Sequence, residues 1–198
     1  MSKKLLIATN NIGKLREYRS LLADIFYELV SPAQVGIDAD VEETGSTFEE
    51  NAILKANEYR VMSGLMTLAD DSGLEVDALG GEPGIMSARY AGEGATDADR
   101  VNYLLAKIKD VPWEKRTARF KCVIAIALPD GKIKLYYGAC DGYITHQVKG
   151  TSGFGYDPIF YLPESNKTMA ELAFEEKNSV SHRGKAALEA HKLLMNLP

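Results

Sequence analysis

Apolar and polar positions along the chain follow two periods, one typical of buried strands and one typical of amphipathic helices. Apolar runs at residues 4–9, 28–30 and 65–69 predict buried strands. Between the first two runs, four apolar residues recur at the spacing of one helix face: Leu15, Tyr18, Leu22 and Ile25. The chain therefore begins with the alternation of strand and helix that is typical of an α/β fold.

Two long apolar runs, 119–128 and 133–140, predict an antiparallel hairpin around an Asp-Gly pair. Because this hairpin interrupts the alternation of strands and helices, the predicted sheet is mixed. A two-residue turn would place Cys122 opposite Ala139 and Cys140 on the other face, so we expect no disulfide.

Capping patterns mark where the remaining helices begin. A Ser or Thr lies three residues before an acidic residue at four places: Ser46, Thr47, Thr96 and Thr168. A last helix is expected to open in the segment after Lys177, with Ser181 as its N-cap.

Length and charge narrow the class of protein. The chain has 198 residues, which predicts one domain, and a net charge of −5. Non-specific nucleic-acid binding needs a basic face, so the acidic balance argues against it. No apolar stretch is long enough to span a membrane, and the N-terminal apolar run is too short for a signal peptide. We expect a cytoplasmic protein with neither a nucleic-acid nor a membrane partner.

The chain is organised around residues 68–74, where an apolar run meets two aspartates and a Ser-Gly pair. The pattern predicts a buried strand that ends in a loop, and the ligands of open α/β sheets bind beyond strand ends. Because successive strand residues point to opposite faces, Asp70 and Asp71 should differ in role. One would face a site while the other supports the loop. An ordinary polar turn would contain the same residue types.

Two glycine-containing loops are candidate ligand contacts. Residues 9–14 follow a predicted strand and open a helix, whose free N–H groups can bind phosphate beside Lys14. The alternative is a capped helix with an exposed lysine. Residues 150–158 combine glycines with Phe154 and Tyr156, which offer stacking faces for a flat ligand. They lack the GxGxxG spacing of a dinucleotide site.

Two further pairs of polar residues are ambiguous. Asn51 and Lys55 share one face of the predicted helix that begins near residue 47, as solvated surface residues also would. His182 and Arg183 lie at a helix start, where cations oppose the helix macrodipole. Such a placement is expected at functional sites, although an exposed pair would cost little.

Six short sequence segments, which include most of the candidate residues above, follow one another along the chain. They are residues 8–14, 42–45 with 48–52, 69–74, 83–85 with 87–90, 153–158 and 181–184. In these segments, the chain closely resembles the inosine triphosphate pyrophosphatase family, hydrolases that remove deaminated purine nucleoside triphosphates. Asn10 and Ser152 depart from the family pattern, since many members carry glycine there.

The resemblance implies an α/β fold in which a mixed twisted sheet with flanking helices forms two lobes around a central nucleotide-binding cleft. Residues 1–198 would form a single inosine triphosphate pyrophosphatase-like domain. Family members usually form homodimers and use Mg²⁺, so both are expected here. They are enzymes that cleave ITP, dITP or XTP between the α and β phosphorus atoms, which yields the monophosphate and pyrophosphate.

The resemblance also implies roles for individual residues. Asp71 would be the general base and a metal ligand, and Glu42 would contribute to the metal. On the phosphate side of the substrate, the family motifs match Thr9, Asn10, Asn11, Ile12, Gly13, Lys14, Asn51 and Lys55. Ser72 would also contact the substrate. For the base and sugar, they match Phe154, Gly155, Tyr156, Asp157, Lys177, His182 and Arg183.

The residue types suit this chemistry independently of the resemblance. Mg²⁺ takes oxygen ligands from one or two carboxylates together with phosphates and water, and the chain has only three His and two Cys for a softer metal. Lys14 and Lys55 would offset charge on the leaving pyrophosphate. A 6-oxo purine presents an acceptor where adenine presents a donor, so Lys177 and Arg183 would favour the oxo base.

Two other functions remain open on the sequence. The same hydrolysis could act on a modified pyrimidine triphosphate, which a substrate panel would separate from purine turnover. A nucleotide-binding sensor without turnover is the second alternative, and the presence of Asp71, Glu42 and Lys14 argues against it. RNA binding ranks last because of the net charge.

Overall fold

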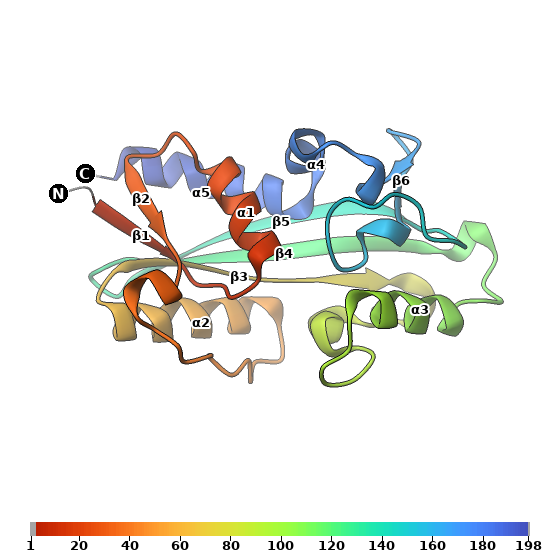
Figure 1. Ribbon diagram of the computed structural model, residues 1–198, viewed down its shortest axis with the longest axis horizontal. Coiled ribbons are helices and arrows are strands. Elements are labelled where there is room, and N and C mark those ends of the chain that lie inside the picture. Colours follow the sequence, from red (N-terminus) through yellow and green to blue (C-terminus); the bar gives the residue numbers. More distant parts are fainter. Residues whose placement is uncertain (1–2, 198) are drawn as a thin grey trace. The chain divides into compact units, whose positions relative to one another are not determined.

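The computed structural model describes residues 3–197 as a mixed α/β fold built on a seven-stranded sheet (Figure 1). Its strands are β1 (Lys3–Ile7), β2 (Tyr27–Val30), β3 (Met66–Val76), β4 (Thr117–Ala127), β5 (Ile133–Ile144), β6 (Phe160–Leu162) and β7 (Lys167–Thr168). Its α-helices are α1 (Ile12–Leu21), α2 (Phe48–Ser63), α3 (Asp97–Lys107), α4 (Phe174–Val180) and α5 (His182–Asn196). The predicted fold class, a mixed sheet with flanking helices, is confirmed.

The strand order in the sheet is β2-β1-β3-β4-β5-β6-β7. β1 runs parallel to both of its neighbours, β2 and β3, whereas β6 is antiparallel to β5 and to β7. Parallel pairing at one end of the sheet reflects the helical crossovers α1 and α2, and the antiparallel pairs follow from short connections. This is the mixed order that the hairpin at 119–140 predicted.

The hairpin turn differs from the expected two-residue form. Leu128 N–H donates to the Lys132 carbonyl at 2.8 Å, and Gly131 N–H donates to the Leu128 carbonyl at 2.9 Å. Leu128 thus faces Lys132 across a three-residue loop in which Gly131 has a φ of 86°. This is the type I turn with a glycine bulge, so the predicted pairing of Cys122 with Ala139 is wrong. Both cysteines are nevertheless free and buried.

The chain forms two compact units. The long strands β3, β4 and β5 each have residues in both units. Unit 1 comprises residues 1–71, 122–138 and 183–198, and unit 2 comprises residues 72–121 and 139–182. The single domain expected for residues 1–198 stays a prediction.

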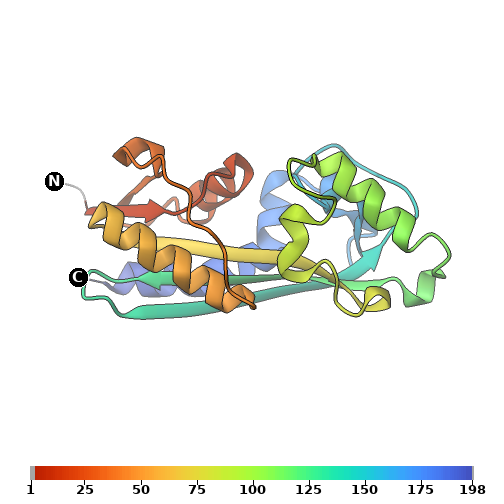
Figure 2. The same ribbon diagram turned by 90° about the horizontal axis from the view of Figure 1, so that it is seen from below.

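Unit 1 has helices on both faces of its strands. α1 and α5 lie on one face and α2 lies on the other (Figures 1 and 2). Tyr18 and Leu22 pack with Ala187 and Leu194 of α5 on Leu68 and its neighbours in the sheet. Tyr18 and Leu22 are part of the predicted apolar stripe, although α1 ends at Leu21, before the expected Ile25.

The core of unit 2 is apolar along β3 and α3. Leu74 and Val76 belong to one buried cluster with Val101 and Leu104 of α3 and with Ile108, the C-cap of that helix. Aromatic residues from later in the chain complete this core, among them Phe120, Tyr156 and Phe160.

Helix caps mostly follow the sequence. Thr47 caps α2 through the Glu50 N–H, and Thr96 and Asp99 form a reciprocal capping box at α3. The segment before the last helix differs from expectation. Residues 174–180 form a separate helix, α4, whose C-cap is Ser181. α5 then begins at His182, so Ser181 directly precedes the last helix, as expected.

The structure also corrects the prediction that a strand ends at Asp70. β3 continues through both aspartates, Ser72 and Gly73 as far as Val76. Charged and polar partners from other elements contact both buried carboxylates inside the strand, so tertiary contacts override their low strand propensity.

No helix within residues 3–197 is long and apolar enough to span a membrane.

Gly150 and Gly36 form a matched pair for testing how tightly the glycine-rich loop, residues 150–158, is packed. Both have positive φ, 78° and 74°, but a Cβ on Gly150 would lie 2.4 Å from the Ala170 carbonyl, whereas one on Gly36 meets nothing within 4 Å. We expect Gly36→Ala to lower the free energy of unfolding by about 1 kcal/mol, from backbone strain alone. Gly150→Ala should cost about 1–3 kcal/mol more, because of the clash. Equal losses in urea unfolding would contradict this packing.

Candidate active site

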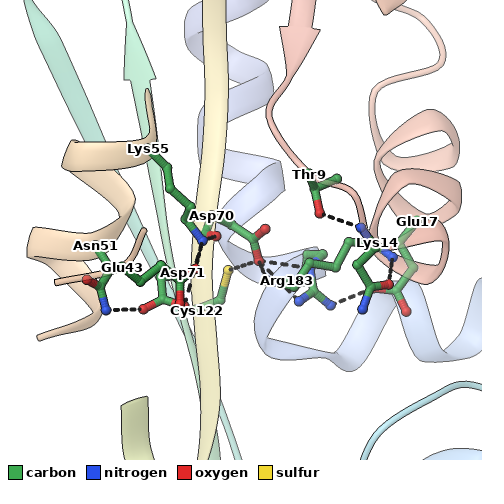
Figure 3. A network of polar contacts seen from close by, with 11 residues as sticks. Thr9, Lys14, Glu17, Glu43, Asn51, Lys55, Asp70, Asp71, Cys122 and Arg183 are labelled. Carbon is green, nitrogen blue, oxygen red and sulfur yellow. Dashed lines mark hydrogen bonds and ion pairs between the residues drawn. The ribbon is translucent and has the colours of Figure 1, made fainter. Parts of the chain in front are cut away.

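Two adjacent aspartates of β3, Asp70 and Asp71, form the centre of the candidate site in unit 1. Both are buried, with exposed fractions of 2% and 5%. Figure 3 shows the two carboxylates pointing to opposite sides of the strand, as the alternation of strand residues predicts. Each therefore has its own set of partners.

Asp70 contacts two cations, the partly exposed Lys14 and the buried Arg183. Its Oδ2 lies 3.1 Å from Lys14 Nζ and 3.1 Å from an Arg183 guanidinium nitrogen. Cys122 Sγ lies 3.7 Å from the same oxygen (Figure 3). Burial opposes ionisation of Asp70, but Lys14 and Arg183 outweigh it and hold the pKa of this carboxyl well below its usual range. The carboxylate is therefore charged at neutral pH.

Arg183 lies in the first turn of α5 and is 1% exposed, so an exposed His-Arg pair is excluded. Its guanidinium also contacts Glu17 of α1, at 2.7 Å. Two carboxylates thus surround the cation and offset its unfavourable position at a helix start. The contact of Arg183 with substrate stays a prediction, and its side chain is committed to Asp70 and Glu17 in this structure.

Asp71 faces α2, where the polar side chains selected from the sequence come together. Its Oδ2 accepts a hydrogen bond from the Asn51 amide at 3.0 Å, and its Oδ1 lies 3.9 Å from Lys55 Nζ. Lys55 Nζ also donates to the Asp70 carbonyl at 2.7 Å and to Glu43 at 2.6 Å. Asn51 and Lys55 are therefore buried beside Asp71, so their alternative as solvated surface residues is excluded.

The charges around Asp71 shift its pKa in a definite direction. Burial raises the pKa of the Asp71 carboxyl, Lys55 works against that rise, and Glu43 adds to it. Burial opposes the charge on Lys55, but the surrounding carboxylates outweigh it and raise the pKa of this amine. Asp71 is thus a stronger base than an ordinary aspartate and lies beside a fixed cation.

Glu43 is a residue of this cluster that the sequence analysis missed. Glu42, which the resemblance implies as a metal ligand, has an exposed side chain, whereas Glu43 forms the 2.6 Å ion pair with Lys55. The two are adjacent in an irregular segment, where no periodicity tells which side chain points inward. Neighbouring Gly45 donates its N–H to Asn51 at 2.8 Å, which ties this segment to α2.

The segment 9–14 forms the start of α1, as expected of a phosphate loop. Thr9 Oγ1 accepts the Asn11 N–H at 3.1 Å, and Asn11 Oδ1 accepts the Lys14 N–H at 3.0 Å. Asn10 and Ile12 are exposed, and Gly13 is partly exposed. Lys14 is not the exposed lysine of the alternative, because its ammonium is paired with Asp70.

The remaining candidates lie in unit 2. Phe154 N–H donates to Asp157 Oδ2 at 2.9 Å, and Lys177 pairs with the same carboxylate. Lys177 Nζ lies 4.6 Å from the centre of the Phe154 ring, and Tyr156 is buried. Phe154, Gly155, Tyr156, Asp157 and Lys177 thus form one cluster, as the predicted base site requires.

Ser72 and His182 complete the candidates of unit 2. Ser72 directly follows Asp71 in β3 and is partly exposed. His182 is 5% exposed, and its ring stacks on Phe120 at 4.6 Å with an interplanar angle of 12°.

The donor set around Asp71 suits a hard cation. Across the described residues, no three His, Cys, Asp or Glu side chains gather closely enough to form a metal site by themselves. Mg²⁺ needs only one or two protein carboxylates when substrate phosphates and water supply the other ligands. Asp71 and Glu43, both near Lys55, could provide those carboxylates.

An α/β chain with a mixed sheet and this acidic and cationic centre matches one family closely. The model described as the Ham1 family matches residues 5–193. The chain therefore belongs to the Ham1 family.

Relatives and solved structures agree with this membership. The dITP/XTP pyrophosphatase of Desulforamulus reducens is 51% identical over 194 residues, covering 98% of this chain and 96% of that protein. The dITP/XTP pyrophosphatase of Bacillus subtilis is 46% identical, covering 97% of each. A HAM1 protein from Coxiella burnetii superposes with a TM-score of 0.89 at 41% identity, covering 98% of this chain and 100% of that one.

The buried position of Arg183 makes a stability prediction. Arg183→Ala would remove the buried counter-ion that Asp70 and Glu17 share, so we expect a loss of about 3–5 kcal/mol in the free energy of unfolding. Lys192→Ala, which breaks the exposed pair with Glu189, is the control and should unfold close to wild type in urea. If the two variants were equally stable, the ion pairs of Arg183 would contribute nothing to the fold.

Proposed function

We propose that this chain hydrolyses deaminated purine nucleoside triphosphates (ITP, dITP and XTP) to the monophosphate and pyrophosphate, with Mg²⁺ as cofactor. The observation that carries the proposal is the buried Asp71 carboxylate, whose pKa is raised beside the cation of Lys55 and the second carboxylate of Glu43. The relatives named dITP/XTP pyrophosphatase, about half identical along nearly the whole chain, support this choice of substrates.

Asp71 is the general base of the proposed reaction. Its carboxylate takes a proton from water as the oxygen of that water forms a bond to phosphorus and the α–β phosphoanhydride bond breaks. Pyrophosphate leaves with the electron pair of the broken bond. The Asn51 amide, at 3.0 Å, fixes the orientation of the carboxylate without neutralising it.

Asp71 and Glu43 are the residues that would hold Mg²⁺, with Glu42 as the alternative that the resemblance implies. Bound Mg²⁺ would neutralise charge on the phosphate oxygens of the substrate. Lys55 lies within 4 Å of both Asp71 and Glu43, so it restrains both carboxylates through ion pairs.

The start of α1 would bind the polyphosphate. Thr9 to Lys14 lead into the N-terminus of a helix, and helix N-termini favour bound anions. Lys14 adds a cation, Lys55 of α2 adds a second one, and Ser72 of β3 is the remaining substrate contact. Stabilising the charge on the leaving pyrophosphate is the largest contribution expected of such groups.

The cluster of Phe154, Gly155, Tyr156, Asp157 and Lys177 would bind the base. His182 and Arg183 are the other two residues that the resemblance implies for the base and sugar. Lys177 would donate to the 6-oxo group, which adenine lacks. We also propose that the chain acts as a homodimer, as expected from the resemblance, and that it does so in the cytoplasm, as expected from its apolar pattern.

A substrate panel tests the proposed function. Wild-type protein with Mg²⁺ should release pyrophosphate from ITP, dITP and XTP far faster than from ATP or a modified UTP, and EDTA should stop the reaction. Asp71→Asn should lower turnover by about 10²–10⁴ while nucleotide binding stays measurable by calorimetry. Binding without pyrophosphate release in the wild type would contradict the proposal and favour a sensor.

The adjacent glutamates allow a matched test of the metal site. Because Glu43 and not Glu42 pairs with Lys55, Glu43→Gln should raise the Mg²⁺ concentration that gives half-maximal rate by about tenfold or more. Glu42→Gln should leave it near the wild-type value. The reverse result would assign the metal to Glu42.

A further inference from the structure

The glycine-rich loop of unit 2, residues 150–158, has contacts within itself and with neighbouring segments. Ser152 N–H donates to the Ala170 carbonyl at 3.1 Å, and Lys177 pairs with Asp157. Asp157 N–H donates to the Phe154 carbonyl at 3.3 Å, and Phe154 N–H donates back to the Asp157 carboxylate at 2.9 Å. A Cβ on Gly153 would lie 2.1 Å from that carboxylate, so the turn closes tightly. These contacts fix the shape of the turn at Gly153–Asp157.

Gly155, in the middle of the loop, has a partner from a distant element. Its N–H donates to Asp97 Oδ2 at 2.7 Å, and Asp97 is the first residue of α3. The other carboxylate oxygen of Asp97 pairs with Arg100. Arg100 in turn donates to the carbonyls of Ala88, at 3.0 Å, and Ala95, at 2.5 Å. Arg100 thus orients the Asp97 carboxylate toward the loop through contacts that do not involve the loop.

The next residue of the loop is tied to the same part of unit 2. Tyr156 O–H donates to the Ser87 carbonyl at 2.9 Å, and Ser87 Oγ accepts the Leu74 N–H of β3 at 2.9 Å. Gly155 and Tyr156 are therefore both joined to the segment that leads into α3.

Helix capping does not account for Asp97. The capping box of α3 uses Thr96 and Asp99, whose carboxylate accepts the Thr96 N–H at 2.9 Å. Asp97, two residues earlier in the same turn, directs its carboxylate to Gly155 instead. Two aspartates of one helical turn thus differ in their partners: Asp99 caps α3, and Asp97 accepts the Gly155 N–H of the loop.

We propose that Asp97 is a positioning residue for recognition of the purine base, acting through the Gly155 amide. This inference rests on the proposed function. Asp97 fixes the loop so that the Phe154 ring and the Lys177 ammonium, 4.6 Å apart, meet the base in one arrangement. Without Asp97, the same side chains remain but must be ordered when substrate binds, which weakens binding of the base.

The test compares Asp97→Ala and Asp97→Asn with Asp99→Ala. Asp97→Ala should raise KM for dITP about tenfold, as expected for the loss of a charge-assisted hydrogen bond, with a smaller change in kcat. Inhibition by inorganic triphosphate, which lacks a base, should be unchanged. Asp97→Asn keeps an oxygen that can accept the Gly155 N–H, so KM should return toward wild type.

Amide hydrogen exchange reads the contact independently of turnover. In Asp97→Ala, the Gly155 amide should exchange about tenfold or more faster than in wild type, because its acceptor is lost. Asp99→Ala should weaken α3 but leave both the Gly155 exchange rate and the KM for dITP near wild type.

Three results would overturn the inference: an unchanged Gly155 exchange rate, an unchanged KM despite faster exchange, or equal effects of Asp97→Ala and Asp99→Ala. Wild-type protein that fails to hydrolyse dITP marks the different case in which the proposed function is itself wrong.

Discussion

Two charged carboxylates lie side by side in a buried strand, and the surrounding structure compensates for them. Burying an unpaired carboxylate costs several kcal/mol, so each needs a cation or hydrogen-bond donor on its own face of the sheet. α1 and α5 supply Lys14 and Arg183 to Asp70, and α2 supplies Asn51 and Lys55 to Asp71. The helices of unit 1 that flank β3 are thus linked to it by charge as well as by apolar packing.

The same burial gives the two aspartates opposite properties. Cations dominate around Asp70 and keep its pKa low, so it remains a fixed negative charge. Around Asp71 burial dominates, its pKa is raised, and it can take up a proton more readily. One carboxylate is suited to holding cations in place and its neighbour to accepting a proton, a division of labour known from other pairs of acidic groups in enzymes.

Patterns among residues close together in the sequence predicted the opposite orientation of the two aspartates and the starts of two helices. The alternation of strand residues separated Asp70 from Asp71, and capping residues marked the starts of α2 and α3. The course of β3 beyond Asp70 could not be predicted, because the cations that stabilise it come from residues far away in the sequence. Glu43 was missed for a related reason: a segment without periodicity does not reveal which of two neighbouring glutamates points inward. The position of Arg183 at a helix start, which opposes the helix macrodipole, marked it as a functional candidate. Its partners, Glu17 and Asp70, come from distant parts of the chain and are known only from the structure.

Cys122 contributes its thiol to the crowded Oδ2 of Asp70, at 3.7 Å, and burial raises the pKa of this thiol to about 12. Oxidants and alkylating reagents attack the thiolate, which is almost absent from this thiol at neutral pH. The sulfur nearest the aspartate pair is therefore chemically inert while the protein is folded. It serves the carboxylates as a weak donor, and the charge arrangement around them is insensitive to the redox state of the surroundings.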